Sequence, residues 1–359
     1  MKKRNTIALL LAAATLFASC GKLPEETTVA TTEETTTAAE ETTTTTAAET
    51  SEETTIAETT AETTVETSAA ETEAEYEPVE IFTSEKGMPR FSVDDGELVF
   101  ADDSYPELQE SLTEEFEYNN IRSCMVYRAD SKVFSVKGTC GSSTEYYNYN
   151  LAGEEITLRD VLYDFPASCE DVILEELEFY HDQYAALWGN DFDMSEVDYD
   201  SVDFLLDANS VVVYINKYPY RIYYADHADI INPDILPDPS AEMFAIYRRG
   251  TLQCADGTML NFNYIEPTSS MEDLSLSVNG TEVRELDLGE GRRRRGFADA
   301  IYYYDGNGGQ YISIYNSGWT DDDFGQFLLG ISGGSYWFIL NTDSHHTDIS
   351  DPDDIAELV

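Results

Sequence analysis

A long tract without a hydrophobic pattern limits how much of this chain can fold. Residues 23–78 are mostly threonine, glutamate and alanine, with no lysine or arginine and no aromatic residue before Tyr76. Such a segment cannot bury enough apolar surface to offset the entropy lost on ordering, and its glutamates repel one another. We therefore expect residues 21–79 to form a disordered, extended tether. A plain spacer and a spacer glycosylated on its threonines both fit this composition.

The first twenty residues predict export and lipid attachment. A basic cluster at residues 2–4 precedes an apolar run at residues 7–17, and Cys20 follows small residues. This order is typical of a bacterial lipoprotein signal peptide, cleaved behind Ser19 so that Cys20 becomes the lipidated N-terminus; an ordinary secreted protein is the alternative. The apolar run is shorter than the ~20 residues of a membrane-spanning helix. We expect residues 1–20 to be removed, and the rest to lie on the extracellular face of the cell membrane, attached through the lipid only.

The chain is strongly acidic. It has 71 acidic and 20 basic residues, a net charge of −51. Sixteen of those acids and four of the bases lie at or before Glu77, so the rest of the chain carries −39. Such a field repels nucleic acid and anionic lipid, and it speeds association with a cationic partner. We therefore expect no nucleic-acid partner, while an acidic surface that serves solubility alone is the alternative for the charge.

Helical and strand patterns alternate in the first half of the folded part. The run RFSVDDGELVF predicts a hairpin with Asp-Gly as its turn. A helix follows at residues 104–121, with Pro106 near its first turn and leucines or phenylalanine every fourth residue on one face. Strands are expected at residues 122–128, 132–136 and 145–151. Ser168 and Asp171 then form a capping-box pattern before an amphipathic helix whose apolar face holds Ile173, Leu177, Tyr180, Tyr184 and Trp188.

Strand patterns dominate the second half. The run SVVVYINKY is apolar on both faces, which predicts a central buried strand. Beyond Pro239, the turns ADGT, VNGT and DGNGG separate alternating segments such as QYISIY, and GGSYWFIL supplies a further strand. We predict an α+β fold, with a mixed α+β domain at residues 80–238 and a β-rich C-terminal domain of antiparallel hairpins at residues 239–359.

One segment resembles a known family. The run NYNLAGEEITLRDVL at residues 148–162, the capped helix after it, and FLLDANSVVVYINKYPYRIYYADHADIINP resemble the extracellular module of RsiV-type anti-sigma factors. Those proteins are lysozyme receptors, and the module also occurs beside peptidoglycan deacetylases. Within the motif, Gly153 allows a tight turn, Leu158 enters the core and Asp160 can accept hydrogen bonds from backbone amides. The resemblance covers about residues 94–236 and implies an α+β domain with a lysozyme-like ligand. With so few residues before the signal, the chain is not expected to be an anti-sigma factor itself.

Aromatic residues are the expected ligand contacts. Tyrosine offers a large contact area at a small entropy cost and is favoured at interfaces. The preferred contact surface is a tyrosine-rich segment, and the alternative is that its side chains complete the core. Trp319, in a turn-like stretch, is a second contact residue. The segment consists of Tyr218, Tyr220, Tyr223 and Tyr224.

Four cysteines follow Cys20. Cys124 and Cys140 flank an expected hairpin turn, so a disulfide between them is one hypothesis and free buried thiols are the other. No cysteine pair has the CxxC spacing of zinc or dithiol sites. We expect no cofactor.

No familiar catalytic or metal-binding motif is present. The acidic run at residues 190–203 lacks the glycine and glutamate that a calcium loop needs. His345 and His346 are adjacent, so on a strand they would point to opposite faces. The basic block Arg292–Arg295 could bind an anionic polymer, but a charge-balanced surface turn is the simpler interpretation.

These observations favour a non-catalytic, membrane-anchored binding module. Its expected ligand is a lysozyme-like cationic protein or a cell-wall glycan. One alternative is an envelope enzyme acting on peptidoglycan or another glycan, because a catalytic carboxylate pair is compatible with so acidic a chain. The other is a structural part of a surface complex.

Overall fold

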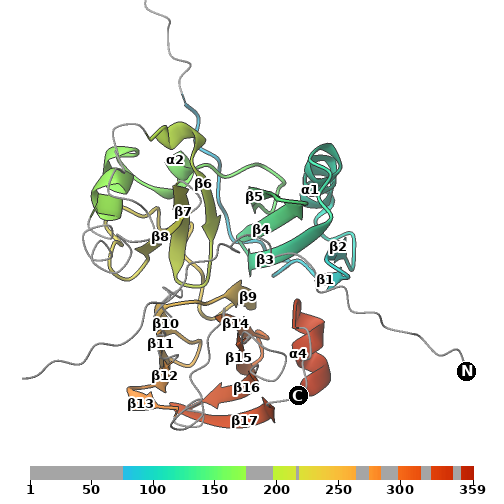
Figure 1. Cartoon of the computed structure of the whole chain (residues 1–359), viewed down its shortest axis with the longest axis vertical. Helices are drawn as coiled ribbons and strands as arrows, with labels where there is room; N and C mark the ends of the chain where they lie inside the picture. The colour runs from blue at the N-terminus through green and yellow to red at the C-terminus, as the bar shows by residue number, and fades with distance from the viewer. Residues whose placement is uncertain are drawn as a thin grey trace, which may run out of the picture. The chain divides into compact units, whose positions relative to one another are not determined.

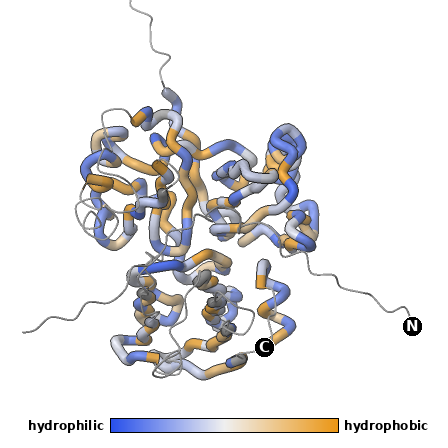
Figure 2. Tube along the Cα trace, in the orientation of Figure 1, coloured by the Kyte–Doolittle hydropathy of each residue, from blue (hydrophilic) through white to orange (hydrophobic). Residues whose placement is uncertain are grey.

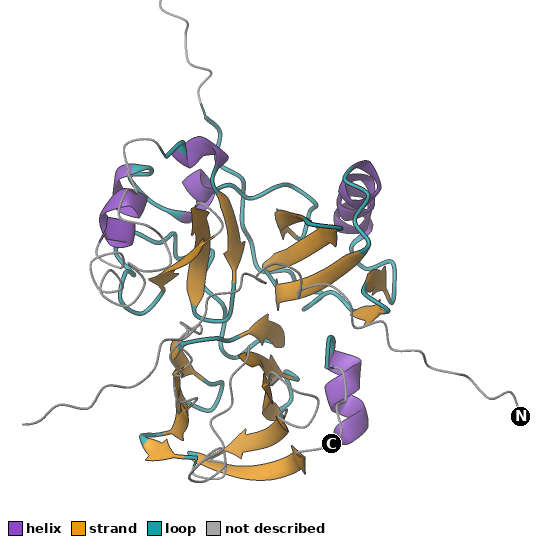
Figure 3. Cartoon of the chain, in the orientation of Figure 1, coloured by secondary structure: helices purple, strands orange, loops and turns teal. Residues whose placement is uncertain are grey.

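Strands dominate the structure, a computed structural model, and helices are few (Figure 3). It describes residues 76–174, 197–215, 218–263, 275–283, 298–316, 325–342 and 349–359. The helices are α1 (Pro106–Tyr118), α2 (Leu158–Val161) and α4 (Pro352–Leu358), with a 3-10 helix η2 (Tyr199–Ser201) and helical residues at 167–174. This content agrees in outline with the expected α+β class.

Seventeen strands are described, and they form four antiparallel sheets. They are β1 (Phe91–Asp94), β2 (Glu97–Phe100), β3 (Ser123–Ala129), β4 (Val133–Cys140), β5 (Ser143–Asn150), β6 (Asp203–Leu206), β7 (Ser210–Ile215), β8 (Tyr218–Tyr223), β9 (Met243–Ile246), β10 (Gly250–Gln253), β11 (Met259–Asn263), β12 (Ser275–Val278), β13 (Thr281–Glu282), β14 (Ala298–Tyr304), β15 (Gln310–Asn316), β16 (Gly325–Ser332) and β17 (Ser335–Thr342).

The largest sheet has eight strands in the order β17-β16-β15-β14-β9-β3-β4-β5 (Figure 1). Strand β9 pairs with β14 on one side and with β3 on the other. Strands from both sides of the boundary expected at residue 238 therefore belong to one hydrogen-bonded sheet. Its two edges are β5 and β17.

Three hydrophobic clusters pack the sheets together. One face of β9 and β14–β17 packs on the four-stranded sheet β10-β11-β12-β13. The other face lies under residues of the β1-β2 hairpin, α1 and α4. The three-stranded sheet β6-β7-β8 shares a third cluster with α2 and residues 169–173. Figure 2 shows the hydrophobic residues along β6 and β7.

Several local predictions are confirmed. The Asp-Gly hairpin joins β1 and β2, with Asp95 and Gly96 both at positive φ. Helix α1 begins at Pro106 and buries Leu108 and Leu112. Strand β7 is the central strand of its sheet, and all its residues except Tyr214 are buried.

The predicted start of the second long helix is wrong by a few residues. Helical structure begins at residue 167, so Ser168 lies in the first turn and its hydroxyl donates to the carbonyl of Tyr163 at 2.6 Å. Ile173 is buried as expected. The other residues of the predicted apolar face, Leu177, Tyr180, Tyr184 and Trp188, lie outside the described residues.

The cysteines do not form the disulfide considered for the β3-β4 hairpin. Its register places Cys124 opposite Gly138, and Cys140 lies two residues further along β4. Such diagonal positions are about 7–8 Å apart, more than a disulfide spans without backbone movement. Cys124, Cys140, Cys169 and Cys254 are all free thiols.

The turn around α2 joins three separate segments. Asp160 accepts a hydrogen bond from the amide of Thr157 at 2.7 Å and another from the amide of Val79 at 2.8 Å. Tyr76 bonds to the Thr157 hydroxyl at 2.9 Å. Asp160 therefore fixes both the start of α2 and the segment that leads into the folded region.

No helix of the described segments has the length and apolar character to cross a bilayer.

Gly153 provides a test of this turn. Its φ is +80°, and a Cβ would lie 2.6 Å from the backbone carbon and oxygen of Glu107. We expect Gly153→Ala to lower the free energy of unfolding by about 1–3 kcal/mol, because it adds a backbone clash to an unfavourable φ. Urea denaturation of the two proteins measures the difference.

Gly141→Ala is the matched control. Gly141 also has a positive φ, of +63°, but a Cβ there would meet no atom within 4 Å. The Gly141→Ala variant should therefore lose only the part of the unfolding free energy that comes from the unfavourable φ. Equal losses in the two variants would contradict the assigned clash with α1.

Candidate functional site

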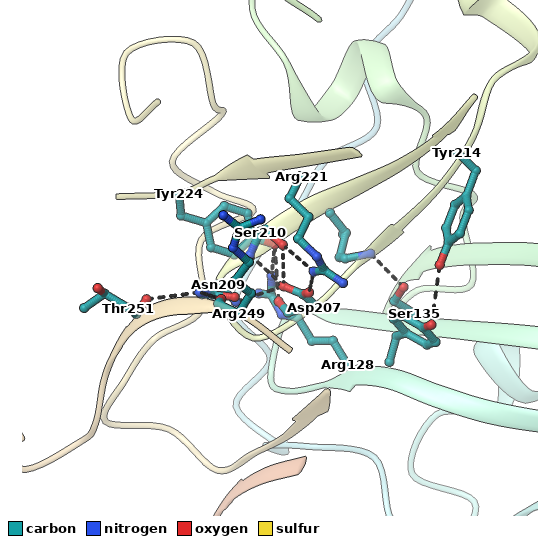
Figure 4. Close-up of polar contacts among 12 residues, drawn as sticks. Arg128, Ser135, Asp207, Asn209, Ser210, Tyr214, Arg221, Tyr224, Arg249 and Thr251 are labelled. Atoms are coloured by element: carbon teal, nitrogen blue, oxygen red, sulfur yellow. Dashed lines mark hydrogen bonds and ion pairs between the residues drawn. The ribbon is translucent and has the colours of Figure 1, made fainter. Parts of the chain in front are cut away.

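A cluster of buried ionic side chains connects β3, the β6-β7 turn and β8 (Figure 4). Asp207 is fully buried and forms an ion pair with Arg221. Its carboxylate also accepts hydrogen bonds from the amides of Asn209 and Ser210, at 3.0 and 2.7 Å, and from the Ser210 hydroxyl at 2.9 Å. A fully hydrogen-bonded carboxylate of this kind fixes the turn between the two strands.

A second buried pair lies beside the first. Arg128 has no exposed surface, and its Nε donates to Asp130 at 2.7 Å. Its Nη2 donates to the carbonyl of Ile235 at 2.7 Å and its Nη1 to the Tyr224 hydroxyl at 3.3 Å. Burial opposes the charge, but Asp130 raises the pKa of Arg128 above its ordinary value. Both ion pairs are internally balanced and shielded from solvent, so the cluster is suited to holding the fold together.

The tyrosine-rich segment contributes to this interior. Tyr220 and Tyr224 are only 2% and 8% exposed, so they do not form a contact surface; their side chains complete the core. Tyr223 is half-buried beside Gly250. The side chain of Tyr218 lies outside the described ones, as do Trp319 and Cys20.

An exposed aromatic side chain lies instead on the edge strand β17. Trp337 is 49% exposed. It is paired with Gly330 of β16, where a Cβ would lie 2.2 Å from two atoms of the indole ring and 2.8 Å from its Nε1. The ring therefore occupies the space above Gly330 that any other residue would fill. Glycine inside a strand often marks such a close approach.

The same cross-strand row continues inward with two tyrosines. Tyr311 lies opposite Gly330, and Tyr303 lies opposite Tyr311. The two tyrosine rings stack with centroids 6.2 Å apart and an interplanar angle of 22°. Tyr311 is half-buried and Tyr303 is buried. We call Trp337, Tyr311 and Tyr303 the aromatic platform.

Carboxylates border the platform at its tyrosine end. The Tyr303 hydroxyl donates to Glu242 at 3.2 Å, and Glu242 forms an ion pair with Arg90 at 2.7 Å. A Cβ on Gly309 would lie 2.5 Å from Oδ2 of Asp305 and 2.7 Å from the Tyr311 hydroxyl. The Asp305 carboxylate and the Tyr311 hydroxyl thus both lie on the side of Gly309 where a Cβ would be.

The turn before β17 is fixed by the neighbouring sheet. The amide of Gly333 donates to Asp256 at 2.6 Å, and the amide of Gly334 donates to the Thr258 hydroxyl at 2.9 Å. Asp256 also accepts from the amide of Thr258 at 2.9 Å. These contacts hold the start of the strand that carries Trp337.

The contact between Asp256 and the turn before β17 should depend on pH. Burial opposes the charge, but the hydrogen bonds from Thr258 and Gly333 lower the pKa of Asp256 to about 2. Since an unfolded aspartate titrates at about pH 3.9, the carboxylate stabilises the fold above that pH and loses its contribution as the pH falls toward 2. We expect Asp256→Asn to lower the unfolding free energy at pH 7 but much less at pH 2. A difference from wild type that is the same at both pH values would contradict this.

The sequence prediction missed Trp337, although one signal was present. Gly330 interrupts the apolar run FLLGIS, and the strand GGSYWFIL follows after a tight turn. Pairing these two strands as a hairpin places a tryptophan opposite the glycine. Among the segments that the sequence analysis weighed as metal or anion sites and argued against, residues 190–196 of the acidic run, Arg292–Arg295, His345 and His346 lie outside the described residues.

Comparison with protein-family models, curated proteins and solved structures finds no match to this chain.

Proposed function

We propose that this chain is a lipid-anchored, extracellular, non-catalytic module that binds a glycan of the cell envelope through the aromatic platform. The supporting observation is the half-exposed indole of Trp337 lying over Gly330. A pyranose ring presents a face of C–H groups, which packs favourably on an exposed aromatic ring while its hydroxyls stay in water. Because Gly330 has no side chain, the indole lies directly on the strand backbone at that point. This contact holds the ring in place before a ligand arrives, which favours binding.

The predicted location at the outer surface of the cell membrane suits this role. The lipoprotein signal with Cys20 would attach the chain outside the membrane, and the acidic tether would hold the platform away from the lipid surface. The hydrogen bonds of Asp160 and the positive φ of Gly153 are compatible with the RsiV-like character proposed for residues 80–238.

A sedimentation experiment tests the proposal. The chain without its signal peptide is mixed with insoluble peptidoglycan at low and moderate salt, and the bound fraction and any soluble fragments are measured. We expect binding without release of fragments, and weaker binding by Gly330→Ala, whose methyl group displaces the indole. Absence of binding would remove the glycan proposal, and release of fragments would support an envelope enzyme instead.

A cationic protein of the lysozyme kind is a second candidate ligand. Helix α1 carries five glutamates and no basic residue, and Tyr118 at its end is 87% exposed. Glutamates near a helix C-terminus reinforce its negative end, so this surface would attract lysine and arginine side chains. Binding of soluble lysozyme that weakens with salt and with Glu114→Gln or Glu117→Gln would support it. Salt-independent binding, or none, would remove it.

A further inference from the structure

An acid, Asp305, lies beside Tyr311 of the aromatic platform, because a Cβ on Gly309 would meet both its Oδ2 and the Tyr311 hydroxyl. Asp305 lies at the end of β14, and Oδ1 of its carboxylate accepts hydrogen bonds from the amides of Asn307 and Gly309, at 2.7 and 2.9 Å. These two bonds fix the carboxylate. Its other oxygen, Oδ2, faces Gly309 and the Tyr311 hydroxyl, and it makes no hydrogen bond with the described residues.

The negative charge of Asp305 reaches the platform. Burial raises the pKa of Tyr311 above its ordinary value, and the charge of Asp305 raises it further. Tyr303 experiences Glu242 in the same way, and there a cation is already in place, because Arg90 pairs with Glu242. The two acids differ in this respect: Glu242 is neutralised by Arg90, whereas within the described residues the Asp305 carboxylate is bonded only to the amides of Asn307 and Gly309.

The charge of the whole chain adds to this local preference. The residues beyond Glu77 carry a net charge of −39, which disfavours anionic polymers and favours ligands that carry a positive charge. A neutral sugar would pack on Trp337 without using Asp305. A sugar with a protonated amine would use both, since its amine can donate a charge-assisted hydrogen bond to a carboxylate oxygen.

We infer that the platform prefers a glycan with free amino groups, a de-N-acetylated amino-sugar polymer, over the N-acetylated form. This inference rests on the proposed function, since it needs a sugar bound at Trp337. Asp305 is assigned as the residue that distinguishes the two forms, and Trp337 as the residue that binds both.

Two probe ligands test the inference. Oligomers of β-1,4-linked glucosamine and of N-acetylglucosamine, equal in length, are titrated into the chain without its signal peptide at pH 6, and Kd is measured by calorimetry. We expect the amine form to bind about 10-fold more tightly at low salt, with a smaller ratio at high salt because salt screens the charge. Asp305→Asn, which keeps an oxygen for the two amides, should bring the ratio close to one.

One control variant and the effect of Trp337→Ala separate the possible failures. Asp103→Asn removes an exposed acid from the β2-α1 connection and should leave the ratio unchanged. Equal binding of both oligomers by the wild-type chain, or a preference that survives Asp305→Asn, overturns the inference and leaves the proposed function standing. Binding of neither oligomer, or binding indifferent to Trp337→Ala, overturns the proposed function as well.

Discussion

Asp207→Ala is expected to lower the free energy of unfolding by about 3–5 kcal/mol, as the removal of one partner from a buried ion pair usually does. The carboxylate is fully buried, bonds to Asn209 and Ser210, and balances Arg221. Alanine removes all of these acceptors at once and leaves the guanidinium of Arg221 in the interior without this carboxylate.

Urea denaturation monitored by tryptophan fluorescence and circular dichroism measures this loss. Arg90→Ala is the matched control, because the Arg90–Glu242 pair has similar geometry but Arg90 is half-exposed. Glu242 is only 13% exposed, but it keeps the hydrogen bond from the Tyr303 hydroxyl when Arg90 is removed, so the control should lose clearly less stability than Asp207→Ala. A loss from Asp207→Ala as small as that of the control would mean that the buried cluster does not hold β6, β7 and β8 together.

Trp337→Ala is expected to weaken glycan binding by about 10–100-fold, equivalent to about 1–3 kcal/mol, while changing stability little. The indole is 49% exposed, so its removal costs the fold only part of its packing area. It would, however, remove the exposed aromatic face on which the pyranose ring is proposed to pack. The bound fraction in the peptidoglycan sedimentation assay measures the effect.

Tyr336→Phe provides the control for this variant. Tyr336 neighbours Trp337 on β17 but packs edge-on against Phe338, in the cluster on the opposite face of the sheet. A change there should leave binding intact. Trp337→Phe should restore part of the affinity, because a smaller ring still offers an aromatic face. Equal binding by wild type and Trp337→Ala would contradict the role assigned to the platform.

Elements with strong local signals could be predicted from the sequence. The Asp-Gly turn at residues 95–96 fixes its hairpin through two residues that tolerate positive φ. Helix α1 follows from the spacing of Leu108 and Leu112 behind Pro106. The interior position of β7 follows from valines on both faces. Each of these signals lies within a few residues of the element that it specifies.

Long-range pairing could not be predicted in this way. Strand β9 is only four residues long, and nothing in MFAI indicates that it pairs with both β3 and β14. The same dependence on long-range pairing explains why the candidate site could not be predicted from the sequence. Tyr220 and Tyr224 look like interface residues in sequence, but both pack in the cluster shared with α2 and residues 169–173, and Arg128 donates to the Tyr224 hydroxyl. The exposed position of Trp337 depends on Gly330, which lies opposite it only after the β16-β17 hairpin has formed.

The position of β9 between β3 and β14 limits where this chain can be cut into fragments that fold. A fragment ending at residue 238 would leave the backbone of β3 with an open side where Phe244 and Ala245 normally pair. Such an unpaired strand invites association with other chains. Folding of the first half, and the ability of the second half to present its tryptophan, are thus expected to succeed or fail together.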